Sequence, residues 1–214
     1  MRVLILIRKE NSDYDIANYK RAIKMVGGKV VIFKDGASGN LLMRRLKKTD
    51  AILFPGGEHA TKWDNFLISY AIKNNKRLLG ICQGMQEMGR YGSDDELLEC
   101  KRHALLDGSK HLVYLNDGIL KRLGESVLLV NSYHREKIEK SSYFRVTGIS
   151  EDGVIEAIEG DNFMIGVQWH PEKDIDDNIF SQKLFKLFVT GNDSMLQFCV
   201  ERLISVFSLW RLRI

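Results

Sequence analysis

The first half of the chain alternates between short apolar runs, rich in β-branched residues, and longer stretches with apolar residues at helical spacing. Strands are predicted at Arg2–Ile7, Lys29–Phe33, Ala51–Phe54 and Leu78–Ile81. Helices are predicted between them at Tyr14–Val26, Leu41–Lys48 and Trp63–Asn74. Because apolar strands alternating with helices are typical of a parallel sheet covered on both faces, the pattern predicts a doubly wound, flavodoxin-like α/β fold.

The second half changes to closely spaced strands separated by turn sequences. These predicted strands are Ser126–Asn131, Phe144–Ser150, Val154–Glu159 and Met164–Gln168. Turn residues at 151–153 and 160–162 connect the last three of them. We therefore expect added, partly antiparallel strands on the same sheet, followed by a helix at Asp177–Val189, so that residues 1–189 form one domain.

The last residues of the chain, 190–214, form a separate predicted unit. A turn at 191–194 precedes Met195–Ile214, which is predicted to be an amphipathic helical extension. Its apolar content favours packing on the domain or on a partner subunit over contact with a membrane surface, because Glu201 sits among its basic residues.

Composition excludes several classes of protein. The 214 residues are 44% hydrophobic and 28% charged with a net charge of +4, which is an ordinary globular mixture. The apolar runs are too short to span a bilayer, and the scattered basic residues do not form a nucleic-acid-binding stripe. Three widely spaced cysteines favour reduced thiols and a cytoplasmic protein over a disulfide framework.

A candidate nucleophile lies where an apolar strand runs into the sequence Gly80-Ile81-Cys82-Gln83-Gly84. A tight strand-to-helix turn with small neighbours presents such a side chain at the carboxyl edge of a sheet. The following helix N-terminus favours the thiolate form of a cysteine. Taken alone, the pentapeptide is equally compatible with a buried core cysteine.

A candidate base follows another strand, in Gln168-Trp169-His170-Pro171-Glu172. Pro171 prevents a helix from starting there, so the side chains of His170 and Glu172 can converge. His170 would act on the thiol proton of Cys82, and Glu172 would orient the imidazole. A third strand ends in Pro55-Gly56-Gly57, whose unobstructed backbone could supply an oxyanion donor from Gly57.

Together and in this order, these segments resemble the class I glutamine amidotransferase-like superfamily over residues 1–189. The second half is most similar to its γ-glutamyl-peptide hydrolase branch, peptidase C26, which includes γ-glutamyl-GABA hydrolases. The resembling stretches are 111–115, Val130-Asn131-Ser132-Tyr133-His134, 150–158 and 166–172.

The resemblance implies a cysteine hydrolase of γ-glutamyl amides that works through a γ-glutamyl thioester. It implies Cys82 as nucleophile, with His170 and Glu172 as its partners. Oxyanion donors would be the amides of Gly57 and Gln83. Substrate-binding residues would be Gln86, Asn131, Ser132, Tyr133 and His134. It implies a small-molecule γ-glutamyl substrate, either a γ-glutamyl amine or a γ-glutamyl nucleotide amidate such as γ-glutamyl-CDP-amidate.

Two departures from the family pattern limit these assignments. Position 83 is Gln, where the γ-glutamyl hydrolases usually have Arg, so only its backbone role transfers. The segment between Gly57 and Trp63 is shorter than in the γ-glutamyl-GABA enzymes, which should leave the leaving-group side more open.

The remaining candidate residues give no further site. His59, His103 and His111 are scattered and lack ligand spacing with any cysteine pair, so no metal site is expected. Cys100 and Cys199 are interpreted as ordinary thiols. No phosphate-binding or dinucleotide glycine motif is present, so no cofactor is implied.

Three functions stay open on the sequence. The first is the free-standing hydrolase, as a monomer or homodimer. The second is a glutaminase subunit that delivers ammonia to a separate synthetase partner, which the same catalytic residues would serve. The third is a non-catalytic binding protein, which the presence of Cys82, His170 and Glu172 together argues against.

Overall fold

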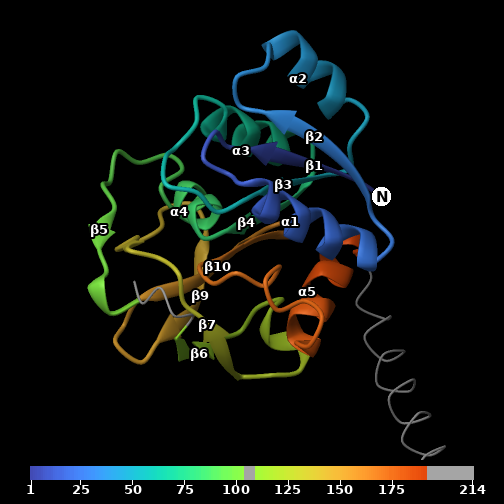
Figure 1. The fold of residues 1–214 in the computed structure, drawn as a ribbon. Helices are drawn as coiled ribbons and strands as arrows, with labels where there is room; N and C mark the ends of the chain where they lie inside the picture. Colours follow the sequence, from blue (N-terminus) through green and yellow to red (C-terminus); the bar gives the residue numbers. More distant parts are fainter. Residues whose placement is uncertain (104–108, 192–214) are drawn as a thin grey trace, which may run out of the picture.

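One large mixed sheet forms the centre of the molecule. The protein is represented by a computed structural model, which describes residues 1–103 and 109–191 (Figure 1). Its parallel part contains β1 (Arg2–Ile7), β2 (Lys29–Lys34), β3 (Ala51–Phe54), β4 (Arg77–Ile81) and β11 (Met164–Val167), in the order β2-β1-β3-β4-β11. The neighbouring strands β1 and β3 pair with Leu4 opposite Ile52, and their apolar residues are buried, as a doubly covered sheet requires.

The sheet continues beyond β11 with antiparallel strands. These are β10 (Ile155–Gly160), β9 (Arg145–Ser150), β6 (Lys110–Leu115) and β7 (Val127–Asn131), in that spatial order. A separate two-stranded sheet pairs β5 (Leu98–Glu99) with β8 (Glu136–Lys137). Short 3₁₀ turns occur at η1 (Lys101–His103) and η2 (Lys121–Leu123).

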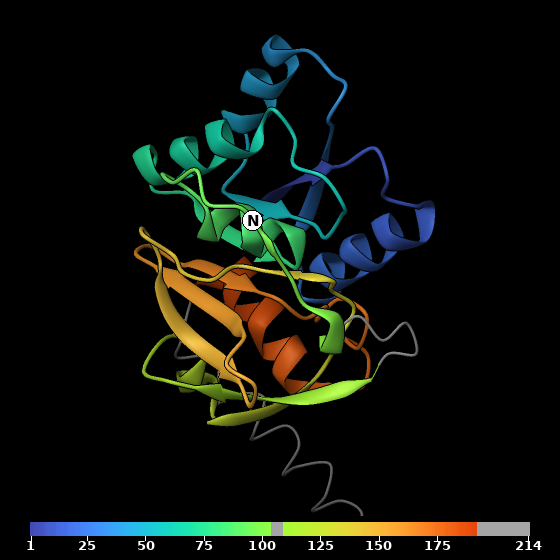
Figure 2. The same cartoon turned by 90° about the vertical axis from the view of Figure 1, so that its left-hand side faces the viewer.

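Helices cover both faces of this sheet, as Figures 1 and 2 show. On one face lie α1 (Asp13–Met25) and α5 (Ile179–Thr190), which contribute Tyr19 and Phe185 to one hydrophobic core. On the other face lie α2 (Gly39–Leu46), α3 (Asp64–Lys73) and α4 (Gln83–Gly89), which contribute Leu42, Leu67 and Met85 to a second core. The sheet thus separates two buried layers.

The fold predicted from the sequence is confirmed, with small shifts at the element ends that have local causes. The first helix begins at Asp13 because Ser12 and Asp15 form a reciprocal capping box. The last helix begins at Ile179 because the side chain of Asn178 accepts from the backbone N–H of Phe180 and Ser181.

Three strands were not predicted, β5, β6 and β8, and two of them are only two residues long. The predicted helix Met195–Ile214 lies outside the described residues, so the division of the chain into 1–189 and 190–214 stays a prediction, while α5 itself runs to Thr190.

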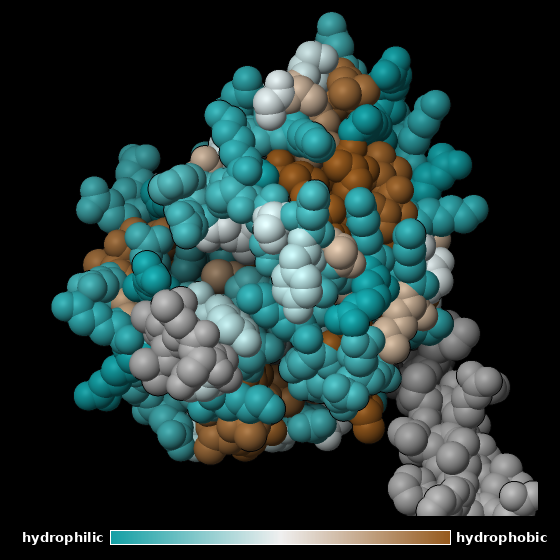
Figure 3. Space-filling view, in the orientation of Figure 1, coloured by the Kyte–Doolittle hydropathy of each residue, from teal (hydrophilic) through white to brown (hydrophobic). Residues whose placement is uncertain are grey.

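The surface in the view of Figure 1 is mostly hydrophilic with separate hydrophobic areas (Figure 3). Within 1–103 and 109–191, no helix is both long and apolar enough to cross a bilayer.

Candidate active site

Cys82 lies in the turn between β4 and α4 with a strained backbone. Its φ is 51° and its ψ is −110°, a conformation that residues with a Cβ seldom adopt. The adjacent glycines make the turn possible. A Cβ on Gly84 would lie 2.4 Å from the carbonyl oxygen of Phe54, and one on Gly80 would lie 2.7 Å from that of Gly84. The turn therefore has the geometry expected of a nucleophile elbow.

His170 and Glu172 follow β11, the strand that pairs with β4. The backbone N–H of Cys82 donates to the carbonyl of Val167 at 2.8 Å, which fixes the two strand ends side by side. The Nδ1 of His170 lies 2.7 Å from Oε1 of Glu172, and both residues are buried. This hydrogen bond places the proton on Nδ1 and leaves Nε2 free to face another group.

The pKa of His170 is raised by nearby charges more than it is lowered by burial. Burial lowers the pKa of the imidazole, but the carboxylate of Glu172 and the sulfur of Cys82 raise it to about 10. His170 therefore carries a proton at neutral pH. A thiolate–imidazolium pair backed by a carboxylate can attack an amide carbonyl and then protonate the leaving nitrogen.

Asn131, the last residue of β7, fixes the backbone of His170. Its side-chain amide donates to the carbonyl oxygen of His170 and accepts from the His170 N–H, both at 2.9 Å. Tyr133, two residues on, is partly exposed, and its ring meets the imidazole edge-on with centroids 5.7 Å apart. Of the predicted substrate-binding loop, Tyr133 is thus the partly exposed residue next to His170, while Asn131 clamps the base itself.

The Pro-Gly-Gly loop is held in place by four residues that the sequence analysis missed. The buried guanidinium of Arg8 donates to the carbonyls of Pro55 and His59 and pairs with Asp64. Two further side chains hold backbone amides: Glu10 accepts from Glu58 and His59, and the Tyr19 hydroxyl accepts from Gly56. No short motif in the sequence links these positions, because they lie on three different elements.

The loop also comes close to the candidate base. A Cβ on Gly56 would lie 2.7 Å from Cε1 of His170, so the backbone packs directly against the imidazole. Gly57 follows it, and a Cβ there would lie 2.5 Å from Cδ of Arg8. This placement next to His170 is compatible with an oxyanion role for the Gly57 amide, which stays a prediction.

The two glutamines of α4 have different surroundings. Gln83 is the first residue of the helix, so its N–H has no acceptor within the helix, as an oxyanion donor requires. Its side chain donates to Glu87 at 2.6 Å. Gln86 is buried and donates to the Glu136 carbonyl and to Gln168. These bonds occupy the Gln86 amide, and its predicted contact with substrate stays a prediction.

Ser132 and His134 lie in a different group of side chains. The hydroxyl of Ser132 donates to the carbonyl of His103, and Nε2 of His134 lies 2.9 Å from Nδ1 of His103. His111 stacks near His103, with ring centroids 4.2 Å apart. From the sequence, His59, His103 and His111 were treated as scattered, but the structure brings His103 and His111 together through η1 and β6.

Comparisons with known proteins identify the family of the chain. Residues 58–172 match the model of the family described as Peptidase C26. The chain belongs to this family. The γ-glutamyl-γ-aminobutyrate hydrolase of Escherichia coli O157:H7 is 30% identical over 213 residues, an alignment that covers 81% of this chain and 84% of that protein.

Other relatives of this peptidase C26 chain include a component of a glutamine-hydrolysing synthase. One of the subunits of the glutamine-hydrolysing GMP synthase of Sulfurisphaera tokodaii is 30% identical over 134 residues, covering 59% of this chain and 69% of that one. Among solved structures, the glutaminase domain of Trypanosoma brucei CTPS with bound acivicin superposes with a TM-score of 0.70. It is 13% identical and covers 90% of this chain and 94% of that one, so it shows a shared fold. This peptidase C26 chain is thus a glutamine amidotransferase-like hydrolase acting on amide bonds.

Proposed function

We propose that this peptidase C26 protein is a free-standing cysteine hydrolase of γ-glutamyl amides. The observation that carries the proposal is the strained Cys82 turn beside a buried His170–Glu172 pair. The similarity to γ-glutamyl-γ-aminobutyrate hydrolase, over most of both chains, supports γ-glutamyl amides as the substrate class.

The proposed reaction proceeds in two halves. The Cys82 thiolate attacks the γ-carbonyl carbon, and the oxyanion accepts hydrogen bonds from the amides of Gly57 and Gln83. The imidazolium of His170 protonates the leaving nitrogen as the C–N bond breaks, which releases the amine and leaves a γ-glutamyl thioester. Neutral His170 then takes a proton from water, whose oxygen attacks the thioester and releases glutamate and the thiolate.

Residues around the pair support this chemistry without touching the scissile bond. Glu172 holds the imidazole through Nδ1 in both halves of the reaction, and Asn131 fixes the backbone of His170. Tyr133 borders the imidazole at the surface and is the best-placed loop residue to contact a bound γ-glutamyl group.

The test is glutamate release by the purified protein without partners. The substrates are glutamine, γ-glutamyl-GABA, other γ-glutamyl amines and a γ-glutamyl nucleotide amidate, each with wild type and Cys82→Ala. We expect one γ-glutamyl conjugate to be hydrolysed much faster than glutamine, and no turnover by the variant. Unchanged glutamate release by Cys82→Ala would refute the mechanism.

The alternative is a glutaminase subunit that delivers ammonia to a synthetase, favoured by the similarity to one component of a glutamine-hydrolysing GMP synthase. In that case the isolated protein hydrolyses glutamine slowly and no conjugate well. Glutaminase activity would then rise on addition of the partner synthetase, and a free-standing hydrolase would show no such stimulation.

A further inference from the structure

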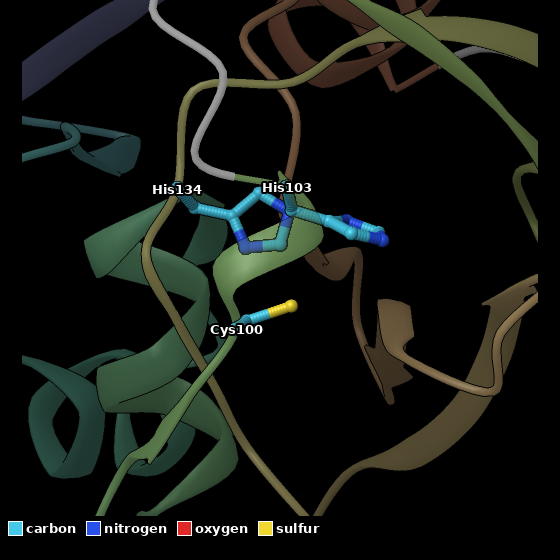
Figure 4. A group of neighbouring side chains, drawn as sticks. All are labelled: Cys100, His103 and His134. Carbon is cyan, nitrogen blue, oxygen red and sulfur yellow. The ribbon is translucent and has the colours of Figure 1, made fainter.

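Three histidines and one glutamate converge beneath the loop that carries Asn131. His103 comes from η1, His111 from β6, His134 from the loop after β7, and Glu156 from β10. Figure 4 shows His103 and His134 with their rings adjacent, and Cys100 close to both. None of these groups has a part in the reaction proposed above.

The inward atoms are spaced like the ligands of one metal ion. Oε1 of Glu156 lies 3.1 Å from Nδ1 of His103, 3.2 Å from Nε2 of His111 and 3.4 Å from Nε2 of His134. The nitrogens of His103 and His134 are 2.9 Å apart. Ligands about 2.0–2.1 Å from a tetrahedral zinc ion are about 3.3 Å from one another, which is close to the three separations from Oε1 of Glu156.

In His134 and His103, the ring nitrogen on the side away from Glu156 lies at hydrogen-bond distance from an acceptor. These acceptors fix which ring nitrogen carries the proton. Nδ1 of His134 lies 3.0 Å from the carbonyl oxygen of Glu136, and Nε2 of His103 lies 3.2 Å from Oδ1 of Asp152. Protons on these outward nitrogens leave lone pairs on the inward ones. An imidazole that donates outward to a carboxylate or carbonyl is the usual arrangement around metal-bound histidine.

Burial makes an uncompensated negative charge at the centre unfavourable. Glu156 is 0% exposed, and His103 and His134 are 4% and 3% exposed. Within the described part of the chain, neither carboxylate oxygen of Glu156 nor Nε2 of His111 has a hydrogen-bond partner of good geometry. A buried carboxylate and two facing lone pairs are unfavourable unless a positive charge lies between them.

We propose that His103, His111, His134 and Glu156 form a structural binding site for a transition-metal dication of the zinc type. Four protein ligands with imidazole and carboxylate donors make a closed site, which is typical of structural rather than catalytic zinc. A pocket at the surface is lined by His103, His111 and Asp152 among other residues, so it adjoins the cluster.

The proposed metal site would stabilise the segment that positions the candidate base, His170. His134 is three residues from Asn131, which clamps His170, and Ser132 between them bonds to the backbone of His103. A metal ion bound by both His134 and His103 would therefore hold the segment 131–134 against η1. In this way it would help to keep Asn131, and with it the backbone of His170, in position.

The experiment uses the full chain in a Cys82→Ala background, so that the candidate nucleophile cannot bind added metal. The protein is stripped with a chelator, and zinc binding is measured by titration calorimetry and by elemental analysis after desalting. We expect one zinc ion per chain. Glu156→Gln and His111→Asn should each weaken zinc binding by about 100-fold or more, because loss of even an outer-shell partner costs about 10–100-fold.

The matched control is His59→Asn, which replaces an exposed histidine outside the cluster and should bind zinc like its parent. Circular dichroism checks that each variant is folded. If Glu156→Gln does not fold, His111→Asn, at the least buried histidine of the cluster (19% side-chain exposure), carries the comparison. Absence of zinc binding by the stripped parent would overturn the proposal, and so would equal zinc affinity in all variants. The negative charge of Glu156 would then be balanced by a bound proton and not by a metal ion.

Discussion

Replacing Gly84 by alanine tests whether the cysteine turn depends on close backbone contact between α4 and β3. The new Cβ would lie 2.4 Å from the carbonyl oxygen and 2.6 Å from the Cβ of Phe54, and neither atom can rotate away. Overpacking of this kind costs about 1–3 kcal/mol, and a backbone clash belongs at the upper end. Alanine gains about 0.5–1 kcal/mol in a helix, so from a cost of about 3 kcal/mol we expect a net loss of about 2–2.5 kcal/mol.

Thermal unfolding and glutamate release together check this prediction. For a chain of this size, each kcal/mol shifts Tm by about 2–4 °C, so Gly84→Ala should lower Tm by about 4–10 °C. Activity should fall further than stability explains, because the relief of the clash moves Cys82 away from His170. The control is Gly36→Ala, where a Cβ meets nothing within 4 Å, and its Tm should be equal to or slightly above that of wild type. A Gly84→Ala protein with wild-type Tm and activity would refute the reasoning.

Two further predictions concern buried charges. The pKa of His170 is raised from 6.5 to about 10, so its stabilising contribution is complete below about pH 6.5 and is lost as pH rises through 10. Urea titrations should therefore show a smaller difference in unfolding free energy between wild type and His170→Gln at about pH 10.5 than at about pH 7. A difference that stays constant over this range would contradict the prediction. Asp64→Asn leaves the buried Arg8 guanidinium without its carboxylate and should cost about 3–5 kcal/mol by urea unfolding. The exposed Asp161→Asn serves as control, and equal losses in both variants would show that the Arg8–Asp64 pair does not stabilise the loop.

The sequence predicted the parts of the molecule that depend on local pattern. Continuous apolar runs identified β1, β3 and β4, and Gly80 and Gly84 around Cys82 identified the turn because such a turn needs small neighbours. The pairing of His170 with Glu172 was also predictable, since only Pro171 separates them.

What the sequence did not predict depends on contacts between distant segments. Arg8 reaches Asp64 across 56 positions, and Asn131 reaches His170 across 39. His103 and His111 were interpreted as scattered because no ligand spacing joins them. Only the antiparallel pairing of β6 with β9 and of β9 with β10 brings His111 beside Glu156.

The parallel and the antiparallel half of the sheet position different parts of the candidate active site. The parallel strands β3, β4 and β11 end at one edge, where they place the Pro-Gly-Gly loop, Cys82 and His170 next to one another. The antiparallel strands β10, β9, β6 and β7 hold the loop from Asn131 to His134, which meets that edge from the side. Because Asn131 bonds to both backbone groups of His170, a shift of this loop is transmitted to the base without any change in the parallel core. The nucleophile therefore depends on the parallel half of the sheet, whereas the backbone position of His170 depends on the antiparallel half as well.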